Sequence, residues 1–299
     1  MTGRDQLYRD PRRQLVDFAF DQAVAAVFPD MIRRSVPAYE TVIPMTGLLA
    51  ARHLAGAGPA PLVVDGGAGS DAGISSRESG GERRDRADAA TGGGPVRARY
   101  RPPAAGADAL AAKAGDGFGL VFDLGCSLGA TTLALLRQLG NRPCRIVAVD
   151  RSKPMLDRAA ELVRDDRVEF RLEDLRETDV SGAGVILMNY VLQFVPPADR
   201  KGLLRRFRER MAPGGLLLLS EKIRFEDAAD QAFFDEVHLD YKKANGYSDL
   251  EVSGKRTALE KVMIADSEDC HLERLRAAGF APVRTWFRCL NWASFLAWA

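Results

Sequence analysis

The hydrophobic pattern of the chain alternates short apolar runs with segments of helical spacing. Residues 120–124 form an apolar run that ends at a glycine, Ala130–Leu139 carries leucines three residues apart, and residues 146–150 form a second apolar run that ends in an acid. Continuous apolar runs of this length are typical of buried parallel strands, and apolar residues three or four positions apart are typical of helices. The stretch is therefore predicted to fold as a strand, a tight turn, a helix and a second strand.

The same alternation continues to the end of the chain and predicts a doubly wound, mostly parallel, seven-stranded α/β sheet. Ser152 before Lys153-Pro154 marks a helix start, because serine caps a helix N-terminus and proline fits its first turn. The last two strands are separated by Asn291 and are expected to close the sheet as an antiparallel hairpin. The further strands are predicted at residues 167–172, 185–190, 216–220, 281–290 and Trp292–Trp298, and the further helices at residues 199–211 and 266–278.

Three other segments lack this alternation of strand and helix patterns. Residues 1–55 carry two helical patterns, one over residues 14–28 that is predicted to end at Pro29 and one around Tyr39–Leu54, and they are expected to cover the sheet. Residues 56–119 are rich in glycine, alanine and arginine and poor in large apolar side chains, which predicts a flexible insertion. Within the α/β domain of residues 120–299, residues 221–265 carry aromatic and charged helical sequence and are expected to form a lid.

Candidate ligand-binding residues follow the predicted strands. Gly125 and Gly129 permit a sharp turn and a close backbone approach to a ligand, and Asp150 ends the second strand, where such folds bind ribose hydroxyls. The Gly-x-x-x-Gly spacing with Ser127 between differs from the dinucleotide fingerprint and is similar to the first motif of S-adenosyl-L-methionine (SAM) methyltransferases, which have a Rossmann-like sheet. A glycine-bounded turn without a ligand is the alternative.

Three further residues have both a structural and a functional interpretation, and Asn189 argues against one class of methyltransferase. Tyr39 is either a packing residue or an electron-rich ring over a sulfonium cation. Asp174 follows the third strand as a surface acid or as a partner of an adenine amino group, and Asn189 ends the fourth strand without the Asn-Pro-Pro-aromatic motif of amino-group methyltransferases. Arg256 follows Lys255 at an apparent loop-to-helix start, in a charge run of a kind that is usually a solvated face, but its guanidinium is also suited to clamp a carboxylate.

Composition excludes several classes of function. The 42 Lys and Arg residues are balanced by 41 Asp and Glu residues, so the net charge of +1 offers no broad basic surface, and direct nucleic-acid binding is not expected. The four cysteines and three histidines are scattered without metal-ligand spacing, so no metal is predicted. The N-terminus lacks an apolar signal core, and no apolar run reaches membrane-spanning length, which predicts no membrane association and a cytoplasmic location.

Several longer strings narrow the interpretation. The chain resembles the carboxy-S-adenosyl-L-methionine (carboxy-SAM) synthase family over everything except roughly residues 56–119. The Asp-Leu-Gly-Cys-Ser and Ala-Asn-Gly-Tyr-Ser strings are specific to that family. The resemblance is carried by Arg34-Ser35-Val36-Pro37, Phe122-Asp123-Leu124-Gly125-Cys126-Ser127-Leu128-Gly129-Ala130, Leu192-Gln193-Phe194, Leu219-Ser220-Glu221-Lys222, Lys243-Ala244-Asn245-Gly246-Tyr247-Ser248 and Lys255-Arg256.

This resemblance implies a set of ligand contacts. Arg151 stands where the family typically has asparagine, so only a backbone contact is expected there. Arg256 would clamp the new carboxylate of the product, in its own subunit or a neighbouring one. The implied contacts fall on Tyr39, Gly125, Cys126, Ser127, Asp150, Arg151, Asp174, Leu175, Asn189 and Arg256.

The resemblance also implies an enzyme that converts SAM and prephenate to carboxy-SAM and phenylpyruvate. It implies a homodimer whose product is handed to a tRNA carboxymethyltransferase for modification of wobble uridine. Two alternatives stay open: an ordinary SAM-dependent methyltransferase acting on a small molecule or tRNA, and a SAM-binding partner without catalytic activity. The sequence identifies no residue that abstracts the methyl proton.

Overall fold

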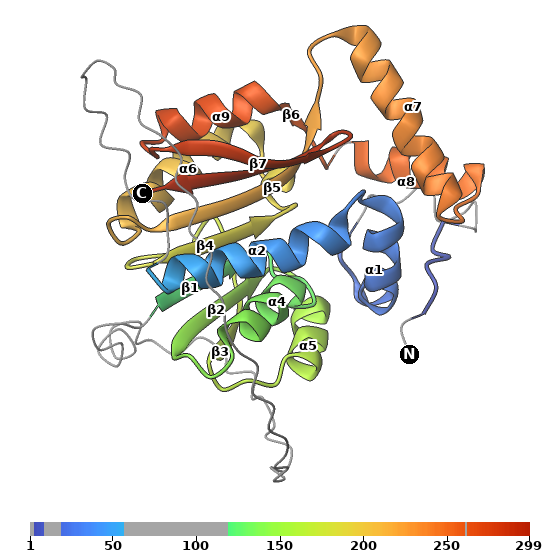
Figure 1. The fold of residues 1–299 in the computed structure, drawn as a ribbon. Coiled ribbons are helices and arrows are strands. Elements are labelled where there is room, and N and C mark those ends of the chain that lie inside the picture. The colour runs from blue at the N-terminus through green and yellow to red at the C-terminus, as the bar shows by residue number, and fades with distance from the viewer. Residues whose placement is uncertain (1–2, 9–18, 57–118, 261) are drawn as a thin grey trace, which may run out of the picture.

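The computed structural model describes residues 3–8, 19–56, 119–260 and 262–299, and its arrangement is shown in Figure 1. The predicted insertion at residues 56–119 therefore lies outside the described residues except at its two ends. The strands are β1 (Gly119–Leu124), β2 (Cys144–Asp150), β3 (Val168–Leu172), β4 (Val185–Asn189), β5 (Leu216–Arg224), β6 (Asp266–Ser267), β7 (Val283–Cys289) and β8 (Trp292–Trp298). The helices are α1 (Gln22–Ser35), α2 (Tyr39–Leu54), α4 (Ala130–Leu139), α5 (Lys153–Leu162), η2 (Leu192–Phe194, a 3₁₀ helix), α6 (Pro197–Arg210), α7 (Ala228–Ala244), α8 (Asp249–Glu260) and α9 (Glu268–Ala277).

The strands form one sheet in the order β3-β2-β1-β4-β5-β8-β7, with the short β6 beside β5. β1 to β5 pair in parallel, whereas β8 is antiparallel to both β5 and β7. The predicted doubly wound sheet with a closing antiparallel hairpin is therefore confirmed, and β6 is an addition of two residues. β4 is buried on both faces, which is why its sequence shows no alternation.

Helices cover both faces of the sheet (Figure 1). On one face α2, α4 and α5 pack against alternate strand residues, and on the other face α6 and α9 pack against the residues between them. This alternation follows from the two-residue repeat of a strand, which sends successive side chains to opposite layers. The first layer includes Val121, Ile146, Ala148, Leu187 and Leu135, and the second includes Phe122, Val147, Val149, Met188 and Phe207.

α2 has the predicted bounds, but α1 differs from the prediction at both ends. Residues 19–21, which were predicted as helical, precede α1, and the side chain of Asp21 caps its start at Gln22. At the other end α1 continues through Pro29 to Ser35 instead of ending at the proline. Pro29 lacks an N–H, yet the last turn of α1 is held by tertiary contacts. Arg34 Nη1 donates to Asp5 O at 3.2 Å, and Arg34 Nε donates to Asn245 O at 2.6 Å. Tertiary packing therefore outweighs the local preference.

The expected lid segment also differs from the prediction. β5 extends to Arg224, so helical structure begins at Ala228 in α7 rather than at residue 221. Lys255 and Arg256 lie inside α8, which starts at Asp249, and not at a loop-to-helix start. α7 and α8 project from the end of the sheet beside α1 (Figure 1). They are thus in place to form one wall of a site at that end.

Candidate functional site

A cavity of about 430 Å³ lies at the carboxyl ends of the parallel strands. β1 lies between β2 and β4, so the strand order reverses at this point, and ligands of open α/β sheets bind at such a reversal. Residues that follow β1, β2, β3 and β4 line the cavity, together with residues of α1, α2, α7 and α8. Its volume is typical of small-molecule sites, which span about 300–1,000 Å³.

The turn after β1 is built around two glycines in the left-handed conformation. Gly125 has a φ of +74°, and a Cβ atom there would lie 2.4 Å from Val191 Cγ2, so a side chain would collide with the next loop. Gly129 has a φ of +77° and immediately precedes α4. Ser127 has a φ of +51°, a left-handed conformation that residues with a side chain rarely adopt. The predicted tight turn is confirmed.

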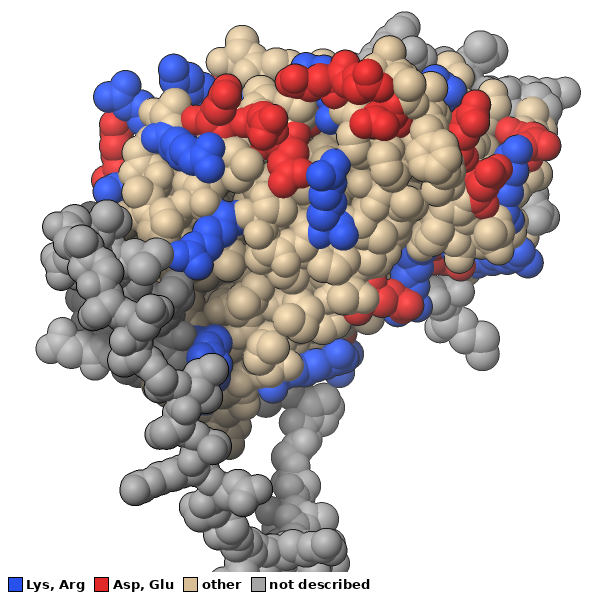
Figure 2. Space-filling model, turned by 45° about the horizontal axis from the view of Figure 1, so that its top comes forward, with Lys and Arg blue, Asp and Glu red and all other residues tan. Residues whose placement is uncertain are grey.

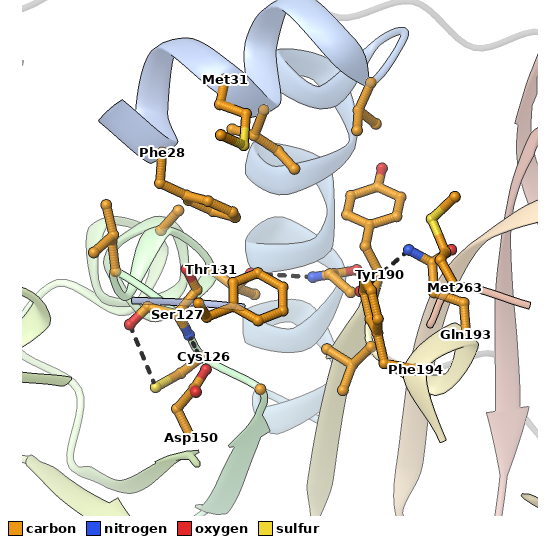
Figure 3. A pocket seen from close by; sticks show the side chains of 18 of the residues that line it. Phe28, Met31, Cys126, Ser127, Thr131, Asp150, Tyr190, Gln193, Phe194 and Met263 are labelled. Atoms are coloured by element: carbon orange, nitrogen blue, oxygen red, sulfur yellow. Dashed lines mark hydrogen bonds between the residues drawn. The ribbon is translucent and has the colours of Figure 1, made fainter. Parts of the chain in front are cut away.

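Asp150, at the end of β2, holds this turn in place. Its Oδ2 accepts a hydrogen bond from Ser127 N at 2.9 Å, and its Oδ1 accepts one from Ser152 N at 2.8 Å. Burial raises the pKa of Asp150, and these two bonds oppose that rise. A carboxylate has about four acceptor positions, so both oxygens retain capacity for ligand hydroxyls. Figure 3 shows Asp150 beside Cys126 and Ser127 on one side of the cavity.

The loop after β3 supplies the neighbouring part of the wall. Asp174 and Leu175 both line the cavity, and so does Arg151, whose side chain is otherwise exposed. Asp174 Oδ2 pairs with Arg176 Nη2 at 2.7 Å, and this hydrogen bond lowers the pKa of Asp174. Asp174 is therefore an ionised acceptor at the cavity edge. Its position is compatible with both interpretations given to it above.

Asn189 ends β4 on the opposite side of the strand reversal. Its Nδ2 donates to Thr131 Oγ1 at 3.1 Å, which fixes the orientation of the amide. Its Oδ1 is buried and has no hydrogen-bond partner in the part of the chain that the structure describes. A buried acceptor without a partner costs about 1–3 kcal/mol, so a ligand donor at this position would be favoured.

An aromatic wall begins next to Asn189. Tyr190 has a φ of +64°, and its ring lies 6.0 Å from that of Tyr39 and 5.2 Å from that of Trp292. Burial raises the pKa of both tyrosines, so their phenols stay neutral. Electron-rich rings in an apolar setting attract a sulfonium cation, and Tyr39 lines the cavity as that interpretation requires.

The helix α1 contributes cavity residues that the sequence pattern assigned to a packing face. Phe28 and Met31 point toward the cavity from above, with Phe194 and Met263 facing them from other elements (Figure 3). The ring of Phe20 lies 6.1 Å from that of Phe28 and 5.6 Å from that of Phe194. Apolar residues that line a cavity have the same spacing as residues that fill a core, so no sequence signal distinguishes the two.

Arg256 is the predicted site residue that the structure places outside the cavity lining. Its side chain is exposed on α8, whereas its neighbour Lys255 is buried and lines the cavity. Lys255 Nζ lies 2.5 Å from Asp5 Oδ2, and Tyr247 OH donates to the same oxygen at 2.5 Å. The Arg34 guanidinium stacks 3.7 Å above the Tyr247 ring. This cluster ties α8 to α1 and to the segment of residues 3–8.

Neither a metal centre nor a membrane-spanning helix is found among the described residues. They contain no group of three His, Cys, Asp or Glu side chains placed to hold a metal ion. None of the helices in the described ranges combines the length and apolar character needed to cross a membrane.

The chain is similar to known proteins over nearly its whole length. The methyltransferase domain family matches residues 121–215. Carboxy-S-adenosyl-L-methionine synthase of Geobacter metallireducens is 38% identical over 298 residues, covering 98% of this chain and 97% of that protein. The enzymes of the same name from Shewanella putrefaciens (38% identical, 99% and 98% covered) and Pseudomonas aeruginosa (36% identical, 99% and 99% covered) are similar to a comparable degree. The chain belongs to the carboxy-SAM synthase family.

Membership in the carboxy-SAM synthase family confirms the predicted family, the SAM-methyltransferase-like fold and the prediction that the chain is an enzyme. In this synthase-family chain the cavity also includes His238, Lys242 and Trp292, none of which was predicted as a site residue. His238 and Lys242 belong to a mixed charge run of α7, where a buried and a solvated lysine look alike in sequence.

Proposed function

We propose that the chain transfers a carboxyl group from prephenate to the methyl carbon of SAM, yielding carboxy-SAM and phenylpyruvate. One observation supports this most directly. In a chain of the carboxy-SAM synthase family, every predicted ligand contact except Arg256 lines a single cavity at the strand reversal. The nucleoside would be held by Asp150 and Asp174, and the sulfonium group would lie beside Tyr39.

The proposed reaction needs no acceptor nucleophile from the protein. The methyl carbon of SAM gives up a proton and, as a sulfonium ylide, attacks the carboxyl carbon that leaves the prephenate ring. The ring becomes aromatic as its carboxyl–carbon bond breaks and its hydroxide departs, and the hydroxide takes the methyl proton to form water. The protein would bind both reactants, orient them and exclude bulk water. The largely apolar walls and neutral phenols of the cavity suit that role.

Mass spectrometry of the nucleoside released from the purified protein tests this function. After incubation with SAM and prephenate we expect a species heavier than SAM by one carboxyl group, together with phenylpyruvate. Incubation with SAM alone and with heat-denatured protein are the controls. Recovery of unchanged SAM would favour a binding protein, and a methylated third molecule would favour an ordinary methyltransferase.

Arg256 is proposed to clamp the carboxylate of carboxy-SAM. It has no carboxylate within 4.0 Å among the residues described, and α8 brings it within electrostatic range of Lys222 and Lys242. Arg256→Ala is expected to leave SAM affinity nearly unchanged and to weaken carboxy-SAM binding about 10- to 100-fold, because it removes charge-assisted hydrogen bonds. Isothermal titration calorimetry with both ligands measures this. Equal losses for SAM and carboxy-SAM would contradict the clamp.

The family resemblance further supports a cytoplasmic homodimer that supplies carboxy-SAM to a tRNA carboxymethyltransferase acting on wobble uridine. The charge distribution favours a hand-off of the small molecule over direct tRNA binding by this chain. On the face drawn in Figure 2, positive and negative side chains of the described residues are interspersed around an uncharged centre. Such a face offers no continuous basic track for a phosphate backbone.

A further inference from the structure

Lys242 differs from the other cationic side chains that line the cavity. Three of those others have a carboxylate partner: Arg33 with Glu40 at 3.0 Å, Arg176 with Asp174 at 2.7 Å, and Lys255 with Asp5 at 2.5 Å. Arg151 has no such partner but is exposed to solvent. Lys242 is only partly exposed, and no carboxylate among the described residues comes within 4.0 Å of its Nζ.

The surroundings of Lys242 are positively charged. In addition to burial, the charges of Lys222, Lys255 and Arg256 all lower the pKa of Lys242. The carboxylate of Asp235 opposes this effect, but it lies 4.0 Å from Lys222 Nζ and is thus shared with that lysine. His238, one helical turn earlier on α7, adds no charge, because burial lowers its pKa to about 3. A partly buried cation next to other cations is unfavourable, and an anionic ligand at this position would offset that cost.

An aromatic path connects this cation to the strand reversal. The Trp292 ring lies 5.2 Å from that of Tyr190 and 6.0 Å from that of His238, and Lys242 follows His238 by one turn on the same helix face. The nucleoside side of the cavity, at Asp150 and Asp174, follows β2 and β3 on the other side of the reversal. A ligand that reaches Lys242 along this path would present an unsaturated ring to the aromatic side chains and a carboxylate to the lysine.

We infer that Lys242 binds a carboxylate of the carboxyl donor, in a subsite next to Trp292 and separate from the nucleoside side of the cavity. This inference rests on the proposed function, since it assigns a place to the second substrate of that reaction. It defines the donor class as a carboxylate joined to an unsaturated ring. The second source of a carboxylate, the amino-acid part of SAM, is distinguished by the experiment below.

The test compares Lys242→Met and Lys242→Arg with Lys243→Met, a control on the neighbouring exposed lysine of the same helix. With SAM saturating, Lys242→Met is expected to raise the KM for prephenate about 10- to 100-fold and to leave the Kd of SAM unchanged. Lys242→Arg keeps the charge and is expected to restore much of the loss. A prephenate KM equal to that of the control would overturn the inference, and so would a parallel loss of SAM affinity.

The pH profile gives a second readout. Burial and the neighbouring cations lower the pKa of Lys242 to about 7. Because only the protonated amine attracts a carboxylate, the KM for prephenate is expected to rise as the pH increases above 7 in the wild type, and to stay flat in Lys242→Arg, whose guanidinium remains charged. The same slope in both proteins would count against the inference. The charged and titratable groups around Lys242 are Lys222 on β5, Lys255 and Arg256 on α8, and Asp235 and His238 on α7.

Failure of the proposed function would be seen separately, as the absence of carboxy-SAM in the wild-type reaction. In that case prephenate would not be consumed, and its binding to the SAM-loaded Lys242→Met and Lys243→Met proteins decides the inference by calorimetry. Weaker binding by the variant than by Lys243→Met would support the subsite, and equal binding would overturn it.

Discussion

Replacing Asp150 with alanine is expected to weaken SAM binding by about 100- to 10,000-fold. The carboxylate would accept hydrogen bonds from two ribose hydroxyls, each worth about 1.5–3 kcal/mol because the acceptor is charged. The substitution also frees Ser127 N and Ser152 N, which now donate to Asp150 at 2.9 and 2.8 Å, so the turn after β1 loses its anchor. Calorimetric titration with SAM measures the loss.

Two comparisons make the Asp150 result interpretable. Asp150→Asn keeps one acceptor oxygen and is expected to bind SAM with intermediate affinity. Asp157→Ala removes an exposed acid from α5, whose partner is Lys153 at 2.7 Å, and should bind SAM like the wild type. Thermal unfolding of each variant shows whether the fold is retained. A folded Asp150→Ala protein with wild-type SAM affinity would exclude the ribose-binding role.

The parts of the fold that were predictable are those where local physics and tertiary structure agree. The continuous apolar run of β4 has no polar face because both of its faces are buried. Ser152 caps α5 as predicted, with its side chain accepting from Met155 N. Gly125 is required by its conformation and by the approach of Val191, so the turn could be recognised from its glycines.

The predictions that failed have two different causes. The last turn of α1 continues past Pro29, and Arg34 ties it to Asn245, more than two hundred residues away in the sequence, so no local window contains both residues. The start of α8, which places Arg256 inside a helix, has a local signal that the sequence-based prediction did not use. Glu251 N donates to Ser248 Oγ at 3.3 Å and Ser248 N donates to Glu251 Oε2 at 2.8 Å, which is a capping box at the start of α8.

The residues that line the cavity also divide into those that the sequence predicted and those that it did not. The residues at strand ends were found because a strand end in a doubly wound sheet has a known position relative to the ligand. Lys242 and Trp292 were not found, because their place depends on how α7 and the hairpin strand β8 approach the reversal. The sequence of a charged helix does not show which of its side chains face a cavity, because that depends on how the helix packs.

Replacing Glu221 with leucine is expected to reduce the free energy of unfolding by about 3–9 kcal/mol, because three buried or partly buried N–H groups would lose their acceptor at roughly 1–3 kcal/mol each. Glu221 Oε1 accepts from Val191 N at 3.1 Å and Leu192 N at 2.8 Å, and Oε2 accepts from Gln193 N at 3.0 Å. Burial raises the pKa of Glu221 to about 8, and these bonds oppose the rise. Denaturant unfolding followed by circular dichroism measures the loss.

The same substitution should reach the site, because the loop that Glu221 holds carries Tyr190, Gln193 and Phe194 into the cavity. Glu221→Gln keeps one acceptor oxygen but turns an amide N–H₂ toward an N–H donor. Its free energy of unfolding is therefore expected to lie between those of the wild type and the leucine variant. Ser220→Ala is the matched control. It removes one buried hydroxyl pair, Ser294 to Ser220 at 2.9 Å, from the adjacent position of β5 and should cost about 1 kcal/mol. A Glu221→Leu protein as stable as this control would mean that the loop holds its conformation without the Glu221 carboxyl group.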